Sequence, residues 1–224
     1  MKQSLTLPLD RTAAIFIDLQ EEHRQDKRFL AEGFDRVIAN TQALLGAARA
    51  NGVRIYHFAY VADPAFTRPF HPVLPNGKSV FSAKDDPLTA ICPEVAPAGG
   101  EKLFIKAQAS AFGDGLGREL KAEGVEWLLI AGVWTEACVD ATVKDAQAHG
   151  FRVLLVKDAC ASGTVAMHQT GILNLANRLY GGAVADTQSA CRLLAGETAP
   201  AWRVEGAVPL RYTFENAGAL YEEL

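Results

Sequence analysis

The fold class of this chain is decided by the stretch Trp127-Leu128-Leu129-Ile130-Ala131-Gly132-Val133-Trp134-Thr135-Glu136-Ala137-Cys138. Its first five residues are all apolar, which is typical of a strand buried on both faces of a sheet. A helical pattern follows over residues 136–149, and Gly150 ends it. A buried strand that runs directly into an amphipathic helix is the repeating unit of a parallel α/β sheet.

The same unit recurs along the chain. Apolar runs predict further strands at residues 13–17, 53–58, 103–106, 152–156 and 183–185. Helical patterns predict helices at 34–49, 116–123, 165–180 and 187–194. With right-handed crossovers, these elements predict a three-layer α/β/α sandwich, Rossmann-like in architecture, around a six-stranded parallel sheet.

The length of 224 residues and the absence of an internal repeat predict a single domain over residues 1–224. Its core is expected at about 12–195, followed by a C-terminal extension over 196–224. Residues 63–100 contain seven prolines, so we expect a long loop with short helical pieces that serves as a lid or an interface. The extension carries several aromatic residues, and we expect it to pack on the domain or on a neighbouring subunit.

Composition and charge exclude several classes of protein. Hydrophobic residues make up 49% and charged residues 21%, which excludes a disordered chain. A net charge of −4 gives no basic surface for nucleic acid or anionic lipid. There is no apolar run of the roughly 20 residues that cross a bilayer and no signal-peptide pattern. Four cysteines without a CxxC pair do not indicate a disulfide scaffold. We therefore expect a cytoplasmic enzyme.

Polar side chains stand where three of the predicted strands end. In open parallel sheets ligands bind at the carboxyl ends of the strands, so these residues are candidates for a site. Asp18 follows the first strand and Lys106 ends the third. Taken singly, Asp18 is equally explained as a cap of the next turn, and Lys106 as a solvated residue.

Cys138 lies in the first turn of the helix after the fourth strand. Gly132 permits an unusual backbone there, and Thr135 can cap the helix that begins at residue 136. The helix N-terminus is expected to lower the pKa of the Cys138 thiol and to make it reactive. The other cysteines do not open a helix after a strand, so we expect Cys92, Cys160 and Cys191 to be small buried residues.

Three motifs in this order resemble those of the isochorismatase-like cysteine hydrolases. They are D-x-Q at 18–20, Lys106 followed by Ser110-Ala111-Phe112, and G-V-x-T-E-x-C-V at 132–139. The resemblance runs from about residue 12 to 194, and residues 157–161 resemble the exit of the family's fifth strand. The superfamily includes nicotinamidase, N-carbamoylsarcosine amidohydrolase and ureidoacrylate amidohydrolase.

The resemblance implies a catalytic triad. Cys138 would be the nucleophile, Asp18 the base, and Lys106 the cation that keeps Asp18 ionised. It also implies a cis peptide between Val133 and Trp134, with an oxyanion hole formed by the backbone N–H groups of Trp134 and Cys138. The implied reaction is hydrolysis of an amide, carbamoyl or ureide C–N bond of a small molecule through a thioester.

The sequence departs from the nicotinamidase pattern after the second strand, where those relatives carry a metal cluster of Asp and His. Here His57 and Asp63 are not in a D-x-H pairing, and His71 lies well downstream. We therefore expect no metal, no cofactor and a substrate other than nicotinamide. His57 is expected to be a hydrogen-bonded residue at a strand end.

Three residues are candidates for substrate contacts. Trp134 either walls the substrate pocket or packs against a neighbouring subunit. Phe112 is expected to form a second wall. Gln20 is expected either to contact substrate or to brace the loop around Asp18.

Two other functions are open to such a chain. One is a binding or interaction protein that has lost its chemistry, although the presence of all three triad residues favours an enzyme. The other is a thiol-redox protein with Cys160 as the resolving cysteine. The proline-rich segment and the aromatic tail lead us to expect a homo-oligomer.

One geometric condition follows from the strand order. In the order 3-2-1-4-5-6, Lys106 starts two strands away from Asp18, or about 10 Å at the usual strand spacing. Its side chain must therefore lean inward for the triad to form.

Overall fold

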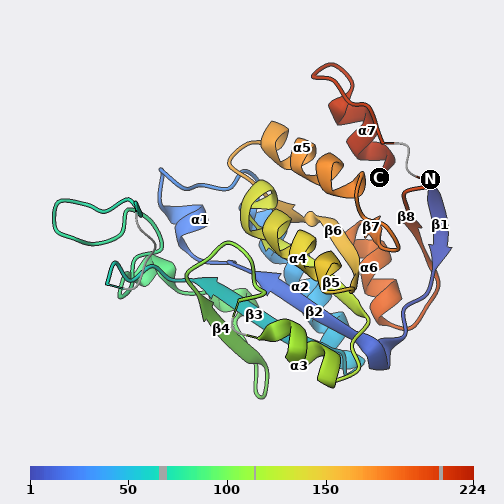
Figure 1. The fold of residues 1–224 in the computed structure, drawn as a ribbon, viewed down its shortest axis with the longest axis horizontal. Helices are drawn as coiled ribbons and strands as arrows, with labels where there is room; N and C mark the ends of the chain where they lie inside the picture. The colour runs from blue at the N-terminus through green and yellow to red at the C-terminus, as the bar shows by residue number, and fades with distance from the viewer. Residues whose placement is uncertain (66–69, 114, 207–208) are drawn as a thin grey trace.

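The computed structural model describes residues 1–65, 70–113, 115–206 and 209–224 of the chain. An eight-stranded sheet forms its centre, in the order β1-β8-β7-β6-β5-β2-β3-β4 (Figure 1). The strands are β1 (Lys2–Leu5), β2 (Thr12–Ile17), β3 (Arg54–Tyr60), β4 (Lys102–Lys106), β5 (Trp127–Val133), β6 (Arg152–Ala161), β7 (Ala183–Ala185) and β8 (Ala199–Trp202).

Six of these strands form the predicted parallel sheet. β2 lies between β3 and β5, β4 pairs with β3, and β6 joins β5 to β7, all in parallel. This is the order 3-2-1-4-5-6 of the predicted strands. Every residue of β2 and of β5 is buried, as their unbroken apolar sequences require.

Two strands were not predicted, so the expected count of six is wrong. β1 pairs antiparallel with β8, and β8 pairs antiparallel with β7 through Val184 and Trp202. Each has four residues with a mixed burial pattern, which is too short a signal to distinguish from a loop. The C-terminal extension therefore packs on the domain by extending its sheet.

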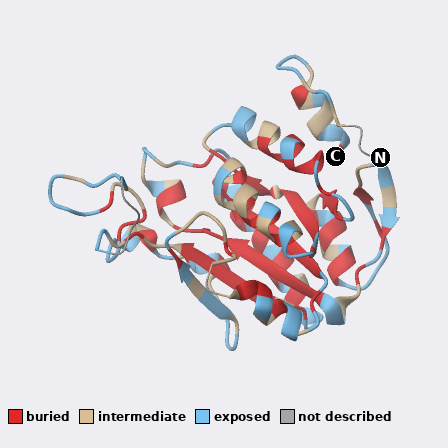
Figure 2. Ribbon diagram, viewed as in Figure 1, coloured by how far each residue is buried: buried red, intermediate tan, exposed pale blue. Residues whose placement is uncertain are grey.

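Helices cover both faces of the sheet, as the three-layer prediction requires. One hydrophobic cluster joins the sheet to α2 (Phe34–Ala50) and α6 (Thr187–Leu194). The other joins it to α3 (Leu116–Ala122), α4 (Asp140–Ala148) and α5 (Val165–Ala176), which Figure 1 shows in front of the sheet. The strands between them are the buried centre in Figure 2. The short helices α1 (Glu22–Gln25) and α7 (Ala217–Glu223) complete the chain, and α7 packs on α5.

Several boundaries differ from the prediction, and the helix predicted at 165–180 ends at Ala176. Residues 157–161 lie inside β6 rather than at its exit. The helix after β5 opens with a π-helical turn, Thr135–Val139, and α4 begins only at Asp140. β3 continues to Tyr60.

The proline-rich segment is mostly loop with two short 3-10 turns, Pro87–Thr89 and Pro93–Val95, as predicted. Its residues 66–69 lie outside the described part of the chain. Among the described residues, no helix combines the length and apolar character needed to cross a membrane.

Candidate active site

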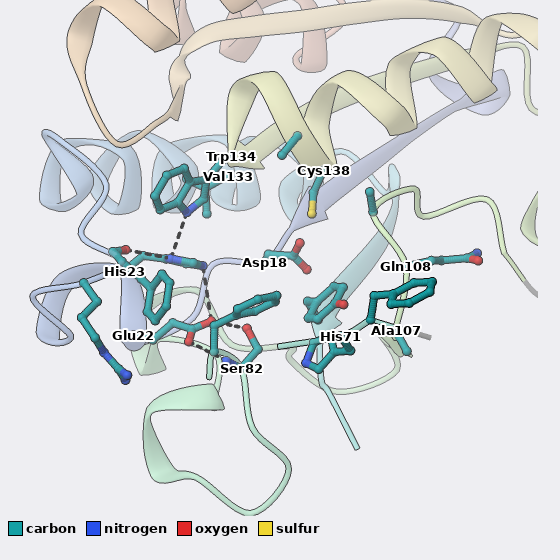
Figure 3. A pocket seen from close by; sticks show the side chains of 17 residues that line it. Asp18, Glu22, His23, His71, Ser82, Ala107, Gln108, Val133, Trp134 and Cys138 are labelled. Atoms are coloured by element: carbon teal, nitrogen blue, oxygen red, sulfur yellow. Dashed lines mark hydrogen bonds and ion pairs between the residues drawn. The ribbon is translucent and has the colours of Figure 1, made fainter. Parts of the chain in front are cut away.

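Three strand ends bring Asp18, Lys106 and Cys138 to one place. Asp18 follows β2, Lys106 is the last residue of β4, and Cys138 lies in the π-helical turn after β5. Lys106 Nζ lies 2.7 Å from Asp18 Oδ2, and both side chains are buried. In Figure 3 the sulfur of Cys138 points toward the carboxylate of Asp18.

Lys106 reaches Asp18 by crossing β3, the strand that separates them. Its ammonium lies 5.1 Å from the centre of the Tyr60 ring on β3. Besides Asp18, it donates to the carbonyl oxygens of Gln108 at 3.2 Å and Ala109 at 3.1 Å. These three acceptors match the three N–H donors of a lysine ammonium, so the cation is held in a defined position. The inward lean required by the strand order is therefore present.

The backbone at the ends of β2 and β5 is closely packed. Asp18 has a φ of 51°, and its N–H donates to the carbonyl of Phe58 at 2.9 Å. Gly132 has a φ of 133°, and a Cβ atom there would lie 2.1 Å from the carbonyl oxygen of Ile17. The unusual backbone predicted at Gly132 is confirmed, because only glycine fits this approach.

The turn that carries Cys138 begins with a cis peptide between Val133 and Trp134, as the family resemblance implies. The carbonyl of Trp134 accepts from the N–H groups of Ala137 at 3.0 Å and Val139 at 3.2 Å, on either side of Cys138. These bonds close the turn around the cysteine.

Thr135 does not cap the helix, so that expectation is wrong. Its hydroxyl is fully buried and donates to the carbonyl of Ala161 on β6 at 3.0 Å. The hydroxyl oxygen also lies 2.8 Å from His168 Nδ1. The side chain points into the core, and Trp134, at the start of the π-helical turn, forms no capping hydrogen bond through its side chain.

A chain of hydrogen bonds links this turn to the C-terminal helix, and sequence reasoning missed it. The Thr135 hydroxyl already donates to Ala161, so His168 Nδ1 must donate to it, which leaves His168 Nε2 to accept from the Tyr221 hydroxyl at 3.0 Å. Burial lowers the pKa of His168 to about 4, which agrees with a neutral ring. The aromatic residues of the tail, Tyr221 among them, were the sequence feature that could have indicated this contact.

Burial raises the pKa of both the candidate base and the candidate nucleophile. The pKa of Asp18 is raised by burial, against the opposing charge of Lys106. Burial and then the negative charge of Asp18 raise the pKa of Cys138 to about 12, although Lys106 opposes both. The lowered thiol pKa expected at a helix N-terminus is therefore wrong, because desolvation outweighs it.

This electrostatic state keeps the proton on the thiol of Cys138 until a base accepts it. Asp18 Oδ2 binds Lys106, whereas Oδ1 is buried and has no hydrogen-bond partner of regular length and angle among the described residues. Since burial raises the proton affinity of this carboxylate, Asp18 is suited to take the thiol proton through Oδ1.

Cys138 and Asp18 line a cavity of about 630 Å³ (Figure 3). Aromatic side chains form much of its wall: Phe29, Tyr60, Phe70, Phe81 and Trp134. A second polar group, formed by Glu22, His23 and Ser82, lies apart from Cys138 in Figure 3. The volume suits a small molecule.

Trp134 lines this cavity, as the pocket-wall alternative predicts. Its indole Nε1 lies 3.1 Å from His23 Nδ1. Burial lowers the pKa of His23, which favours a neutral ring, and Nδ1 then either accepts from the indole or donates to the carbonyl of Phe29 at 3.2 Å. The indole is thus fixed between the turn of Cys138 and helix α1.

Gln20 and Phe112 are not among the described residues that line the cavity, so this cavity gives no support to their expected substrate contacts. Gln20 is fully buried, and its amide donates to the carbonyls of Tyr60 at 3.0 Å and Thr89 at 2.7 Å. It therefore braces the loop, as the alternative prediction has it. Phe112 stacks on His149, with ring centres 5.1 Å apart.

The histidines considered as metal ligands have protein partners. His57 is buried inside β3, with Nε2 2.9 Å from Glu101, so it is hydrogen-bonded but not at a strand end. His71 Nε2 lies 2.7 Å from the hydroxyl of Ser79, at the cavity wall.

One group of described side chains has the composition of a metal site: Glu21, Cys92 and Glu94. The guanidinium of Arg24 binds both carboxylates, at 2.8 Å from Glu21 and 2.9 Å from Glu94. Burial raises the pKa of Cys92 to about 12, so its thiol does not ionise readily. An arginine therefore supplies the positive charge that this group needs.

Cys160 lies opposite Gly132 on β6 and is only 3% exposed. It is not among the described residues that line the cavity, and burial raises its pKa to about 12. This placement gives no support to Cys160 as a resolving cysteine for a redox function.

The chain resembles known proteins in sequence and in fold. The family model described as Isochorismatase domain matches residues 12–189. The chain belongs to the isochorismatase family. The maleamate amidohydrolase of Pseudomonas putida is 30% identical over 175 residues, which cover 74% of this chain and 79% of that protein. The N-carbamoylsarcosine amidase of an Arthrobacter species is 28% identical over 195 residues, or 83% of this chain and 72% of the relative.

Solved structures share the fold, among them a putative isochorismatase from Burkholderia xenovorans, with a TM-score of 0.71 at 24% identity over 87% of this chain and 92% of that one. A cysteine hydrolase from Pseudomonas syringae superposes with a TM-score of 0.75 at 21% identity, covering 85% of this chain and 95% of that one. The predicted family and the predicted α/β architecture are thus confirmed, and so is the prediction of a hydrolase.

Proposed function

We propose that this isochorismatase family member hydrolyses the C–N bond of a small carboxamide, carbamoyl or ureide compound through a thioester on Cys138. The observation that carries the proposal is the buried Lys106–Asp18 pair, 2.7 Å apart, beside a cysteine that lines a cavity. The relatives named as a maleamate amidohydrolase and an N-carbamoylsarcosine amidase support the same type of bond.

In the first half of the reaction, Asp18 accepts the proton of the thiol as Sγ of Cys138 attacks the carbonyl carbon. The backbone N–H groups of Trp134 and Cys138 donate to the oxyanion that forms. The proton on Asp18 then passes to the leaving nitrogen, so that ammonia or an amine departs and the thioester remains.

In the second half, water attacks the thioester while Asp18 accepts one of its protons. The C–S bond breaks, the acid product leaves, and the proton returns to the Cys138 sulfur. Lys106 balances the negative charge of Asp18 whenever that carboxylate is unprotonated. Neither a metal nor a cofactor takes part in the proposed sequence.

The test is ammonia release from a panel of small amides, ureides and carbamoyl acids, with and without a chelator. Cys138→Ala should lower turnover by at least about 10³-fold, because the covalent route is lost. Cys160→Ala is the matched control and should retain activity, since that thiol lies outside the cavity. Equal release by wild type and Cys138→Ala would refute the cysteine mechanism, and loss of activity on chelation would refute its independence of metals.

We further propose that the enzyme forms a homo-oligomer in the cytoplasm, as the proline-rich segment, the aromatic tail and the composition predict. Light scattering tests the first part, and a mass of 24.1 kDa for the particle would contradict it.

A further inference from the structure

The end of the cavity away from Cys138 contains a second buried carboxylate, that of Glu22 on α1. Its side chain is only 6% exposed, yet it lines the cavity. Ser82 donates to it twice, from its N–H to Oε2 at 2.8 Å and from its hydroxyl to Oε1. These two bonds tie α1 to the loop that precedes Pro87–Thr89.

Glu22 differs from the other charged residues of the cavity in having no fixed counter-ion. Asp18 is paired with Lys106, and Arg28 is paired with Asp26 at 2.6 Å. No described lysine or arginine forms an ion pair with Glu22. The nearest ionisable partner of Glu22 is His23, whose Nε2 lies 3.9 Å from Oε1. Burial lowers the pKa of His23, which favours its neutral form.

The charged groups around Glu22 are two carboxylates, Asp26 and Asp86, and the guanidinium of Arg28, which interacts electrostatically with Glu22 but forms its ion pair with Asp26. The charges of Asp26 and Asp86 raise its pKa further, after burial itself, while the two bonds from Ser82 oppose the rise. A desolvated carboxylate without a cation is costly to bury, and a bound positive group lowers that cost.

The Glu22 carboxylate also has room for a ligand. Each carboxylate oxygen can accept about two hydrogen bonds, and Ser82 uses one on each. The wall beside it is aromatic: Phe81 packs edge-on against Phe29, with ring centres 5.8 Å apart. An aromatic wall beside a carboxylate suits an organic cation.

We propose that Glu22 binds a positively charged nitrogen group at the far end of the substrate, so that the enzyme selects amides or ureides with a cationic tail. This inference rests on the proposed function, because it concerns the non-reacting end of the same substrate. Glu22 acts here as a specificity residue and does not touch the reacting carbonyl.

A purely structural role for Glu22 predicts a different effect of its replacement on substrate selectivity. If Glu22 only clamps the loop through Ser82, its replacement affects all substrates alike. Glu22→Gln removes the charge and keeps an oxygen for Ser82, whereas Ser82→Ala weakens the clamp and keeps the charge. The two variants therefore separate the two roles.

The experiment uses a matched series of amides with two to five methylenes between the carboxamide and the tail. The tail is an ammonium, a methyl or a carboxylate group, and kcat/KM is measured for each compound. Wild type should favour the ammonium compounds. Glu22→Gln should lower kcat/KM for them by about 10- to 100-fold, the value of a hydrogen bond to a charged group, and change the methyl compounds by less than about threefold. Ser82→Ala should lower all three classes by the same factor.

Binding to Cys138→Ala, measured by calorimetry with the same compounds, separates this inference from the proposed reaction. Preferential binding of ammonium compounds without turnover by wild type would support the Glu22 subsite and refute the proposed hydrolysis. Turnover with no preference, or with a preference for carboxylate tails that would implicate Arg28, would overturn the subsite and leave the hydrolysis intact. A uniform effect of Glu22→Gln on all three classes would also overturn it.

Discussion

Each end of the cavity contains one buried carboxylate, but only one of the two carboxylates has a buried counter-ion. Asp18 is 3% exposed and Glu22 is 4% exposed, and burial raises the pKa of both. Asp18 has a lysine at 2.7 Å, whereas the bonds to Glu22 come from the neutral Ser82. Equal burial therefore produces a permanently balanced charge at one end and an unbalanced charge at the other.

The difference follows from how each end is built. Asp18 directly follows β2 and Lys106 ends β4, and the parallel sheet fixes the register of both strands against β3. Glu22 and Ser82 stand on a short helix and a loop, and Ser82 has a φ of 45°, which is uncommon for a residue other than glycine. The sheet fixes the reacting end, whereas loop contacts shape the end that meets the rest of the substrate.

We expect the largest effects when the charges of Asp18 and Lys106 are removed one at a time. Asp18→Asn and Lys106→Met should each lower the free energy of unfolding by about 3–5 kcal/mol, because each leaves a buried charge without its partner. The double variant should recover most of that loss. All three variants should lose about 10²–10⁴-fold in turnover, which separates catalysis from stability.

Glu22→Gln is the matched variant at the other end. It should leave the free energy of unfolding within about 1 kcal/mol of wild type, because it removes a charge that has no counter-ion. Urea unfolding at pH 7 gives the free energy of unfolding of wild type, of this variant, and of the single and double variants at Asp18 and Lys106. A loss at Glu22→Gln as large as that at Asp18→Asn would contradict the difference in charge balance.

A smaller test compares the backbone of the two ends. Gly132→Ala should cost about 3 kcal/mol, because its Cβ would lie 2.1 Å from a carbonyl oxygen at a φ of 133°. Gly77, in the loop at the Glu22 end, has a φ of 80° but nothing within 4 Å of a Cβ. Gly77→Ala should therefore cost only about 1 kcal/mol from its left-handed backbone.

Thermal unfolding of the two glycine variants checks this contrast. Equal losses would mean that the close approach of β5 to β2 adds nothing beyond the backbone conformation. A greater loss of stability in Gly77→Ala than in Gly132→Ala would contradict the expectation that the backbone is more closely packed at the Asp18 end of the cavity.

The sequence could predict that Asp18, Lys106 and Cys138 lie at one end of the cavity, because strand ends and the motifs of the family resemblance both point to them. Apolar runs locate β2, β4 and β5, the parallel order brings their carboxyl ends together, and the polar residues there are Asp18, Lys106 and Cys138. The reach of Lys106 across β3 was the one condition that strand spacing alone left open.

The other end was not predictable in the same way. Glu22 and Ser82 are 60 residues apart, and their contact depends on a loop conformation that no periodicity reports. Gln20 and Phe112 illustrate the same limit, since adjacency to a triad motif did not place either in the cavity. The pKa of Cys138 also required the structure, because its burial outweighs the local effect of the helix N-terminus.

The smallest predicted effect is a pH dependence of stability that belongs to Glu22. Burial raises its pKa above 4.5, so between 4.5 and that raised value the folded protein binds more protons than the unfolded chain. Its contribution to stability is therefore complete below pH 4.5 and is lost as the pH rises through the folded pKa. Glu22→Gln escapes this loss, so its free energy of unfolding relative to wild type should increase with pH above 4.5.

The slope of that increase is at most about 1.4 kcal/mol per pH unit, the limit for one proton. Glu101→Gln is the matched control, because the hydrogen bond from Arg49 lowers the pKa of Glu101 to about 2. Between pH 2 and 4.5 its difference from wild type should change with the opposite sign, since that carboxylate stabilises the fold once ionised. Urea unfolding from pH 2 to 8 covers both transitions, and parallel curves for Glu22→Gln and wild type above pH 4.5 would show that the charge of Glu22 is balanced after all.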